Sequence, residues 1–415
     1  MTPPSSDARD LFDRGRAALE AGDPHEAVEC LTRAIDLRPD VPAAYRARAA
    51  AFVTLNRRGE ALADLDRAVR LRPTDPAALF ERAELQFKQR MFDAAVEDCD
   101  AVLALDPGWA VALGLRGECH AAAGNAAQAF ADFAAAIAGD PDHAPAYRLA
   151  RANLRLDTDD PAGCVEDCSA ALVPDPVNAA AYRLRGVALR ELGDLPAADA
   201  DLSESVRLAP EVAAGWLARA AVRADLGRFA DAVADCDEAV RLAPTGGRAL
   251  SLRATCRERL GDLSGAADDL GQALARQQTA VGFVARAGVF AKLGRSREAL
   301  ADLGDALRRQ PENAAAFNLL GRLLATDPEL RDGPRAKEAA TRACELTDWA
   351  RPATLHTLAA ACGMWGAGCR RRVASASRRA DWECRAGQSR LCGARPAGPG
   401  GDRLPFRRVG AAEPA

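Results

Sequence analysis

A period of 34 residues runs through most of this chain and constrains its fold more than any other feature. The most regular copy is AAGWLARAAVRADLGRFADAVADCDEAVRLAP, residues 213–244. In each half of this stretch, apolar residues recur at three- and four-residue steps, which is the period of one helix face. Gly227 interrupts the pattern between the halves, and Pro244 closes it. Each copy therefore predicts two helices joined by a turn.

A single helix pair of this size cannot bury its own apolar stripes, so it needs similar neighbours. The chain supplies ten such repeats, at 8–41, 42–75, 76–109, 110–143, 144–178, 179–212, 213–246, 247–279, 280–313 and 314–346. The fifth repeat is one residue longer than the period, and we expect TDDPAG (158–163) to replace its tight turn. The tenth repeat carries a longer turn, TDPELRDGP, between its two helices.

The residue types at fixed places resemble those of the tetratricopeptide repeat family. In the first helix, its pattern has an aromatic residue or Leu, followed by Gly or Ala. In the second helix it has Ala, then an aromatic residue or Leu, then Ala. A Pro closes the repeat. In residues 213–244 these structural places hold Trp216, Ala220, Gly227, Ala232, Ala239 and Pro244. The resemblance covers about residues 8–346. It implies an all-α fold, a right-handed α-solenoid of about ten helix–turn–helix units.

The two ends of the chain depart from this array. We expect residues 1–7 to be a disordered N-terminus and residues 347–362 to be a partial eleventh unit. Beyond Cys362 the period fails, and residues 363–415 are rich in Arg and Gly, with a net charge of +7. Two interpretations stay open for this segment: a disordered basic tail, or the product of a reading-frame shift near Cys362.

Composition limits the classes of function. The net charge of −4 leaves an acidic body once the basic segment is set apart, which argues against nucleic-acid binding by the repeats. No apolar run is long enough for a membrane span, and no signal peptide opens the chain, so we expect a cytoplasmic protein. The twelve cysteines form no CxxC pair, and Cys99, Cys168 and Cys236 fall at one apolar helical place. They predict small buried side chains in a reducing compartment.

Paired charges recur through the array, with an Arg in the first helix and an Asp in the second. Because a ligand site should be special to one or two repeats, we interpret these charges as structural partners between packed helices. If half exposed, each pair would contribute about 0–1 kcal/mol. The residues are Arg14, Arg48, Arg82, Arg116, Arg185, Arg219, Arg253 and Arg286, with Asp64, Asp98, Asp132, Asp167, Asp201, Asp235, Asp269 and Asp302.

The resemblance implies that ligands contact the concave face lined by first helices. We place Arg148 and Arg183 at the fifth place, and Arg155 and Arg190 at the twelfth place, of adjacent repeats. Stacking should then align them into a basic strip that binds carboxylates or phosphates of an acidic partner. The alternative is a solvated face of ordinary arginines.

Phe80 and Phe87 are a second candidate for partner binding. They lie seven residues apart on one helix face and form a possible apolar anchor. The alternative is that the two rings pack against the adjoining repeat.

Nothing in the sequence predicts catalysis. His25, His120, His143 and His356 are scattered without a nucleophile motif, and no glycine-rich phosphate loop opens a helix. Cys164 and Cys168 supply at most two of the four ligands of a closed zinc site, so we expect no metal and no cofactor.

The sequence therefore predicts a non-enzymatic protein–protein interaction scaffold that binds a peptide or a partner helix in the concave groove. One alternative is the regulatory or truncated repeat portion of a larger bacterial signalling enzyme system, such as a kinase fused to such repeats. Another is that the Arg-rich segment binds nucleic acid or anionic surfaces.

Overall fold

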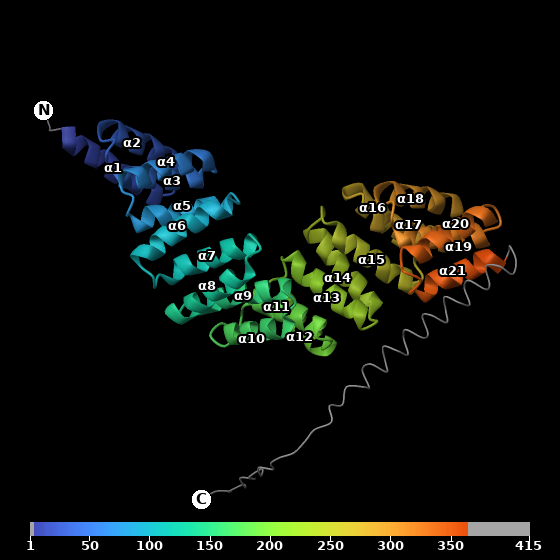
Figure 1. Cartoon of the computed structure of the whole chain (residues 1–415). Coiled ribbons are helices and arrows are strands. Elements are labelled where there is room, and N and C mark those ends of the chain that lie inside the picture. The colour runs from blue at the N-terminus through green and yellow to red at the C-terminus, as the bar shows by residue number, and fades with distance from the viewer. Residues whose placement is uncertain (1–3, 364–415) are drawn as a thin grey trace, which may run out of the picture. The chain divides into compact units, whose positions relative to one another are not determined.

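The computed structural model describes residues 4–363, and every regular element in this range is an α-helix. The chain divides into two compact units, an N-terminal unit of residues 1–244 and a C-terminal unit of residues 245–415. Within each unit the helices follow one another in chain order, as Figure 1 shows. This arrangement confirms the predicted all-α solenoid.

Helices of similar length alternate with short turns in both units. The N-terminal unit contains α1 (Pro4–Glu20), α2 (Pro24–Leu37), α3 (Pro42–Thr54), α4 (Arg58–Leu71), α5 (Pro76–Lys88), α6 (Phe92–Leu105), α7 (Ala110–Ala122), α8 (Ala126–Gly139), α9 (Ala144–Asp157), α10 (Pro161–Leu172), α11 (Ala179–Glu191), α12 (Leu195–Leu208), α13 (Ala213–Asp225) and α14 (Phe229–Leu242). The C-terminal unit contains α15 (Gly247–Leu260), α16 (Leu263–Arg276), α17 (Ala280–Lys292), α18 (Ser296–Arg309), α19 (Ala314–Thr326), α20 (Gly333–Glu345) and α21 (Pro352–Gly363).

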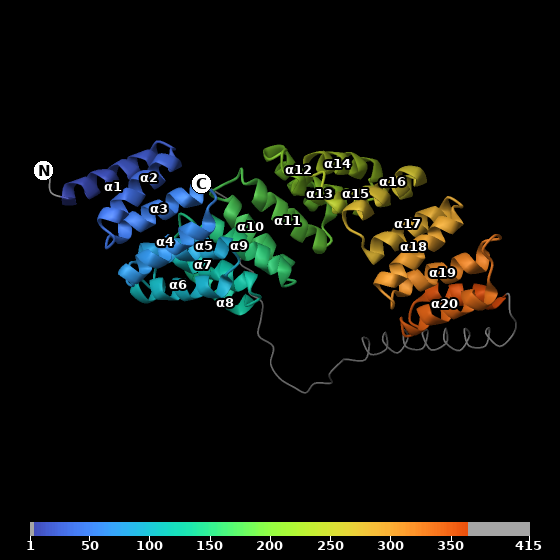
Figure 2. The ribbon, with the colours of Figure 1, turned by 90° about the horizontal axis from the view of Figure 1, so that it is seen from above.

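Small residues bring the two helices of a repeat close together. Ala220 and Ala232 are fully buried, and Ala239 is nearly so. In the sixth repeat, a Cβ added to Gly186 would lie only 2.6 Å from Cγ of Leu202 on the partner helix. Consecutive helices pack along these small side chains, and Figure 2 shows the same order from a second direction. The core is therefore a series of thin layers, as a repeat array requires.

The aromatic place in the first helix links adjacent repeats. Trp216 donates its indole Nε1–H to the carbonyl oxygen of Pro210 at 2.8 Å, and Tyr45 donates its hydroxyl to the carbonyl oxygen of Pro39 at 3.1 Å. Both acceptors are the closing prolines of the preceding repeat. Each bond satisfies a backbone carbonyl at the point where one repeat ends.

The turn inside a repeat needs one residue with positive φ. Gly227 adopts it, with φ of +76°, and glycine does so without steric cost. Asn56, Arg90 and Asp159 take φ values of 58°, 63° and 62° at the same place in their own repeats. The turn geometry is therefore kept even where the glycine is absent.

The fifth repeat keeps this tight turn, so the expectation that TDDPAG replaces it is wrong. α9 ends at Asp157 and α10 begins at Pro161, with Asp159 in the positive-φ place. Asp160 caps α10 by accepting a hydrogen bond from the Gly163 N–H at 2.9 Å. Aspartates supply both the left-handed residue and the cap, a substitution that local propensity allows. The extra residue lies at the start of α9.

The ends of the array differ in part from expectation. α1 begins at Pro4, so residues 4–7 are helical rather than part of a disordered start. The longer turn of the tenth repeat is present between Thr326 and Gly333, as predicted. α21 packs against α19 and α20, in the position of a first helix of an eleventh repeat. The segment 364–415, with both interpretations of it, lies outside the described residues.

Candidate functional site

The recurring Arg and Asp form a bridge inside each repeat. Arg82 on α5 donates from Nε and Nη2 to the two carboxylate oxygens of Asp98 on α6, at 2.8 and 2.6 Å. Its Nη1 donates to Asp66 on the preceding α4 at 2.8 Å, so one guanidinium joins three helices. We call the Arg–Asp pair the repeat bridge. The bridges are Arg48–Asp64, Arg82–Asp98, Arg116–Asp132, Arg151–Asp167, Arg185–Asp201, Arg219–Asp235, Arg253–Asp269 and Arg286–Asp302.

These contacts confirm the structural interpretation of the paired charges, with two changes. Arg14 pairs with the exposed Glu26, because Cys30 occupies the bridge position of α2. In the fifth repeat the bridging cation is Arg151, which the sequence analysis missed because the extra residue of α9 moves it by one place. The bridge carboxylates are also buried rather than half exposed, so removing one partner of a pair should cost more than it would in an exposed pair.

Arg148 and Arg155 converge on the carboxylate of the fifth repeat bridge. Nε of Arg155 lies 3.3 Å from Oδ2 of Asp167, and Nη1 of Arg148 lies 4.0 Å from Oδ1 of the same side chain. Nη1 of Arg155 is also 3.7 Å from Oε2 of Glu166. Because the Asp167 side chain is only 3% exposed, its charge needs these cations. Both arginines therefore contribute to the fold of the repeat.

The register of the bridges separates Arg148 from Arg183. Arg148 lies three residues before its bridging Arg151, whereas Arg183 lies two residues before Arg185. The residue of α9 that matches Arg183 is Leu149, which packs against the core of the fifth repeat. The four arginines therefore do not form two aligned rows, because the extra residue of α9 offsets one pair from the other.

The two arginines of α11 differ in their partners. Arg190 is exposed and donates from Nε to Oδ2 of Asp225 at 2.5 Å, so it links α11 to α13. Arg183 is partly buried and forms no hydrogen bond or ion pair with any residue between 4 and 363. Of the four predicted arginines, only Arg183 is unpaired within this part of the chain.

Arg46 occupies the place of Arg183 in the second repeat, two residues before the bridging Arg48. Arg46 donates from Nε to Oε2 of Glu81 at 2.9 Å, and its Nη1 lies 3.6 Å from Oδ2 of Asp75. The hydrogen bonds with Glu81 raise the pKa of Arg46 above its ordinary value. The next repeat thus supplies two carboxylates to this guanidinium.

The repeat after Arg183 lacks both of those carboxylates. Ala218 stands where the third repeat has Glu81, and Val212 stands where it has Asp75 at the start of the first helix. Val212 is 42% exposed, so the position next to the start of α13 is open to solvent. Arg183 consequently has no counterpart of either carboxylate that pairs with Arg46.

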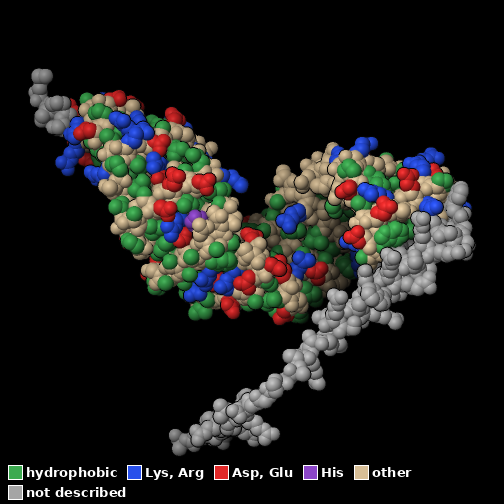
Figure 3. Space-filling view, in the orientation of Figure 1, with side chains coloured by type: hydrophobic (Ala, Val, Ile, Leu, Met, Phe, Trp, Pro, Cys, Tyr) green, Lys and Arg blue, Asp and Glu red, His purple; other side chains and the backbone are tan. Residues whose placement is uncertain are grey.

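First helices of the N-terminal unit line one face, which we call the first-helix face. It carries a hollow of about 250 Å³ between α3 and α5, lined by Arg46, Val53, Glu84 and Lys88 among others. A second hollow, of about 530 Å³, lies around Phe12 near the start of the chain. Figure 3 shows Lys and Arg interspersed with Asp and Glu over the visible surface of this unit. The surface visible in this view therefore carries no large patch of positive charge alone.

Phe80 and Phe87 both pack inside the chain. The Phe80 ring centroid lies 5.2 Å from that of Trp109, and the Phe87 centroid lies 5.8 Å from that of Phe92. Both phenylalanines are partly buried against separate core clusters. The rings thus stabilise the third repeat and its junction with the fourth, and only part of each remains open to a partner.

Cys30, Cys99, Cys119, Cys164, Cys168, Cys236, Cys256 and Cys344 are buried, as predicted for Cys99, Cys168 and Cys236. Burial raises the pKa of Cys99 and of Cys119 to about 12, so these thiols are neutral near pH 7. Sγ of Cys164 lies 3.9 Å from Sγ of Cys168. Within residues 4–363, no three His, Cys, Asp or Glu side chains gather as metal ligands would, and no helix is long and apolar enough to cross a bilayer.

Consecutive helix pairs, positive-φ turns and closing prolines define a helical repeat protein. A family model described as tetratricopeptide repeat matches residues 12–76, 47–110, 80–144, 149–213, 191–247, 217–280 and 284–345. The chain therefore belongs to the tetratricopeptide repeat family, whose members bind protein partners and are typically non-catalytic scaffolds. No curated protein sequence matches the chain.

The chain is similar to several solved structures at low sequence identity. A tetratricopeptide repeat protein from Parabacteroides merdae is 18% identical, with 60% of this chain and 99% of that chain covered and a TM-score of 0.51. MamA from Desulfovibrio magneticus is 20% identical over 40% of this chain and 93% of its own, with a TM-score of 0.39. The Cut9–Hcn1 hetero-tetramer of APC/C is 16% identical over 90% and 86%, with a TM-score of 0.45.

Proposed function

We propose that this chain is a non-enzymatic scaffold that binds an acidic segment of a partner protein on the first-helix face, with Arg183 anchoring a carboxylate. One observation carries the proposal: Arg183 has no carboxylate among residues 4–363, whereas Arg46 at the same place has two. A planar guanidinium matches a carboxylate in a bidentate pair, so Arg183 is suited to this ligand.

The surroundings of Arg183 define the rest of the contact. Val212 and Ala218 place apolar surface where Arg46 has its carboxylates, which favours a partner with an aliphatic side chain next to its acidic one. Arg148, Arg155 and Arg190 hold this surface in place through their own ion pairs. The exposed parts of Phe80 and Phe87, on α5 of the third repeat, offer a separate apolar contact to the partner.

The cellular setting follows from the cysteines. Cys30, Cys99, Cys119, Cys164, Cys168, Cys256 and Cys344 are free, buried thiols, which fits a reducing compartment such as the cytoplasm. In that setting the chain would work as an adaptor between proteins, with no cofactor.

Quantitative affinity capture from an extract of the source cells tests this proposal. The wild-type chain is compared with Arg183→Gln and with the matched control Arg46→Gln. Losing a hydrogen-bonded charge contact costs about 1.5–3 kcal/mol, so we expect Arg183→Gln to retain the partner at least about tenfold less. Arg46→Gln should retain it at the wild-type level, since that guanidinium is already saturated.

Two results would reject the proposal. Equal retention by wild type and Arg183→Gln would show that this guanidinium contacts no partner. Retention that does not fall with added salt would exclude a charge-based contact, because exposed ion pairs are screened by salt.

A further inference from the structure

The tenth repeat lacks the repeat bridge. Its register follows from the close approach of the two helices: a Cβ on Gly321 would lie 3.1 Å from the carbonyl oxygen of Ala336 and 3.2 Å from Cβ of Ala340. In the sixth repeat, Gly186 approaches Ala198 and Leu202 in the same way. Ala340 therefore corresponds to Leu202.

Three replacements follow from this register. Leu320 precedes Gly321 as the bridging Arg185 precedes Gly186, and Ala339 precedes Ala340 as Asp201 precedes Leu202. On the preceding helix α18, Gly304 occupies the place of Asp66, the third partner of a bridge. A Cβ added to Gly304 would meet nothing within 4 Å. An ionic link between three helices is thus replaced by Leu, Ala and Gly.

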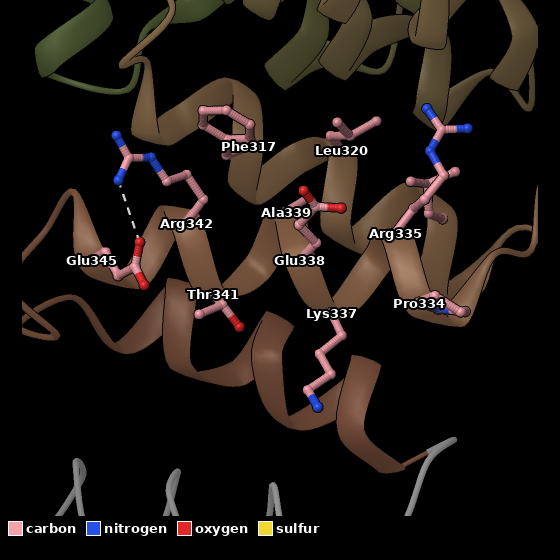
Figure 4. A pocket seen from close by; sticks show the side chains of 11 residues that line it. Phe317, Leu320, Pro334, Arg335, Lys337, Glu338, Ala339, Thr341, Arg342 and Glu345 are labelled. Atoms are coloured by element: carbon pink, nitrogen blue, oxygen red, sulfur yellow. Dashed lines mark hydrogen bonds and ion pairs between the residues drawn. The ribbon is translucent and has the colours of Figure 1, made fainter.

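The missing bridge leaves a groove of about 840 Å³ along α19 and α20. Its floor is apolar and consists of Phe317, Leu320 and Leu324 from α19 with Ala339 from α20. Figure 4 shows Phe317 and Leu320 projecting from α19 beside the labelled side chains of α20. Phe317, Leu320 and Leu324 follow each other at three- and four-residue steps, so they form one helix stripe.

The rim of the groove carries an excess of cations. Arg335, Lys337 and Arg342 line it, against Glu338 and Glu345. Arg342 is engaged, since its guanidinium lies 3.3 Å from Glu345. The Arg335 side chain is 63% exposed, and its Nε makes only a long contact of 3.9 Å with Oδ2 of Asp332. Lys337 has no ion pair with any residue in the range 4–363. The available positive charge therefore lies near the start of α20, where the helix dipole adds to it.

We propose that this groove binds an amphipathic helix of a partner protein. The apolar stripe of that helix covers Phe317, Leu320 and Leu324, and its acidic residues face Arg335 and Lys337. Ridges of a helix fit a helix stripe of this spacing. α20 is 13 residues long, or about 20 Å, which suits a partner helix of three to four turns. This site lies in the C-terminal unit and does not depend on the contact proposed for Arg183.

Peptide display on the full chain tests the proposal. Random 16-residue peptides are selected on the wild-type chain and counter-selected on the double variant L320R/A339D, which places the two bridge residues in the groove. We expect the selected peptides to carry apolar residues at helical spacing with acidic residues on one flank. Fluorescence anisotropy should show at least about tenfold weaker binding to L320R/A339D.

Charge reversal on the rim keeps the test independent of folding. Lys337→Glu changes an exposed side chain, and we expect it to weaken the same peptides several-fold. Arg297→Glu, also exposed but outside the groove lining, is the matched control and should leave their affinity unchanged. Peptides without the apolar and acidic pattern, or equal binding to wild type and L320R/A339D, would overturn the proposal.

Photo-crosslinking distinguishes the other possible occupants. A benzoylphenylalanine at Thr341, which lines the groove, is irradiated in the full chain with the selected peptide. A crosslink to the peptide supports the proposal. A crosslink to a second copy of the chain, or within the chain to residues 364–415, that excludes the peptide would assign the groove to that occupant instead.

Discussion

The eight bridged repeats and the tenth repeat solve the same packing problem in opposite ways. In a bridged repeat, a guanidinium spans the two helices and satisfies a buried carboxylate, as Arg219 does for Asp235 at 2.7 Å. In the tenth repeat, Leu320 and Ala339 take these places and leave an open apolar groove. In a bridged repeat the Arg and Asp side chains occupy the surface between the two helices. Where the bridge is absent, that surface is open to a partner.

Arg46 and Arg183 show the same difference on the first-helix face. Arg46 pairs with the carboxylates of Glu81 and Asp75, whereas Arg183 pairs with no carboxylate among the described residues. In both comparisons the regular copy stabilises the fold, and the copy that departs from it is the candidate for binding. The following experiments are arranged by the size of the effect that this comparison predicts.

Removing a bridge carboxylate should have the largest effect. Asp235 is only 2% exposed and neutralises both Arg219 and Arg223. Breaking a buried ion pair costs about 3–5 kcal/mol, so we expect Asp235→Ala to lower the free energy of unfolding of the seventh repeat by that amount. Hydrogen exchange along α13 and α14 measures it, because repeat arrays open locally.

The exposed Asp231 provides the control for this loss. It pairs with Arg228 at 2.8 Å, and the Asp231 side chain is 50% exposed. Asp231→Ala should therefore change the stability by less than about 1 kcal/mol. A similar effect of the two substitutions would show that the bridge is no more than a surface ion pair.

Most of the regular features could be predicted from the sequence, because a 34-residue period fixes them. The bridge pairs, the apolar helix faces and the longer turn of the tenth repeat are examples. Arg151 was missed because one extra residue at the start of α9 moves it one place along the repeat. The turn that follows could have corrected the register, but it carries Asp159 and Asp160 instead of the usual glycine. A count from the closely packed small residues, rather than from the repeat start, would have found it.

The candidate sites were harder to predict because they depend on what is absent. The unpaired state of Arg183 follows from Ala218 and Val212 in the next repeat, which a search for charged residues does not examine. Leu320 and Ala339 occupy the two bridge places of the tenth repeat. The longer turn between α19 and α20 changes their spacing in the sequence, so the repeat period alone does not pair them. Close approach of Gly321 to α20 was needed to set the register.

Restoring the bridge in the tenth repeat should give the next largest effect. Leu320→Arg alone buries an unpaired cation and Ala339→Asp alone an unpaired anion, so each should destabilise the C-terminal unit. Together they should recover most of this loss, with a coupling free energy of about 1–3 kcal/mol in a double-mutant cycle. Chemical denaturation of the four proteins measures the coupling. Additive effects would mean that the tenth repeat cannot form the bridge.

Alkaline pH should affect the N-terminal unit through its buried thiols. Burial raises the pKa of Cys99 and Cys119 from 9.0 to about 12, so above pH 9 the unfolded state releases protons that the folded state keeps. Stability is then full below pH 9 and falls as pH rises toward 12, by at most about 1.4 kcal/mol per pH unit for each thiol.

Thermal unfolding between pH 8 and 10.5 measures this loss. Replacing both cysteines with alanine should remove their part of the pH dependence. The remaining part belongs to other buried groups such as Cys168, whose pKa is raised by the hydrogen bond with Cys164 and by burial. An unchanged pH dependence in the double variant would assign the alkaline loss to other groups.

The smallest stability effects concern Arg46 and Arg183, and here the comparison is most informative. Arg46→Gln should cost about 0.5–1 kcal/mol, since it breaks a partly buried pair with Glu81. Arg183→Gln should stay within about 0.5 kcal/mol of wild type, because no internal contact is lost. For partner binding we predict the reverse: Arg183→Gln should weaken binding more than Arg46→Gln.

The two measurements together separate structural from binding arginines. An arginine whose loss lowers stability but not binding is structural, and one whose loss lowers binding but not stability belongs to the binding site. Differential scanning calorimetry of both variants supplies the first half of this test and affinity capture the second. If Arg183→Gln proved the more destabilising substitution, Arg183 would have a partner within the chain and would not be assigned to the binding site.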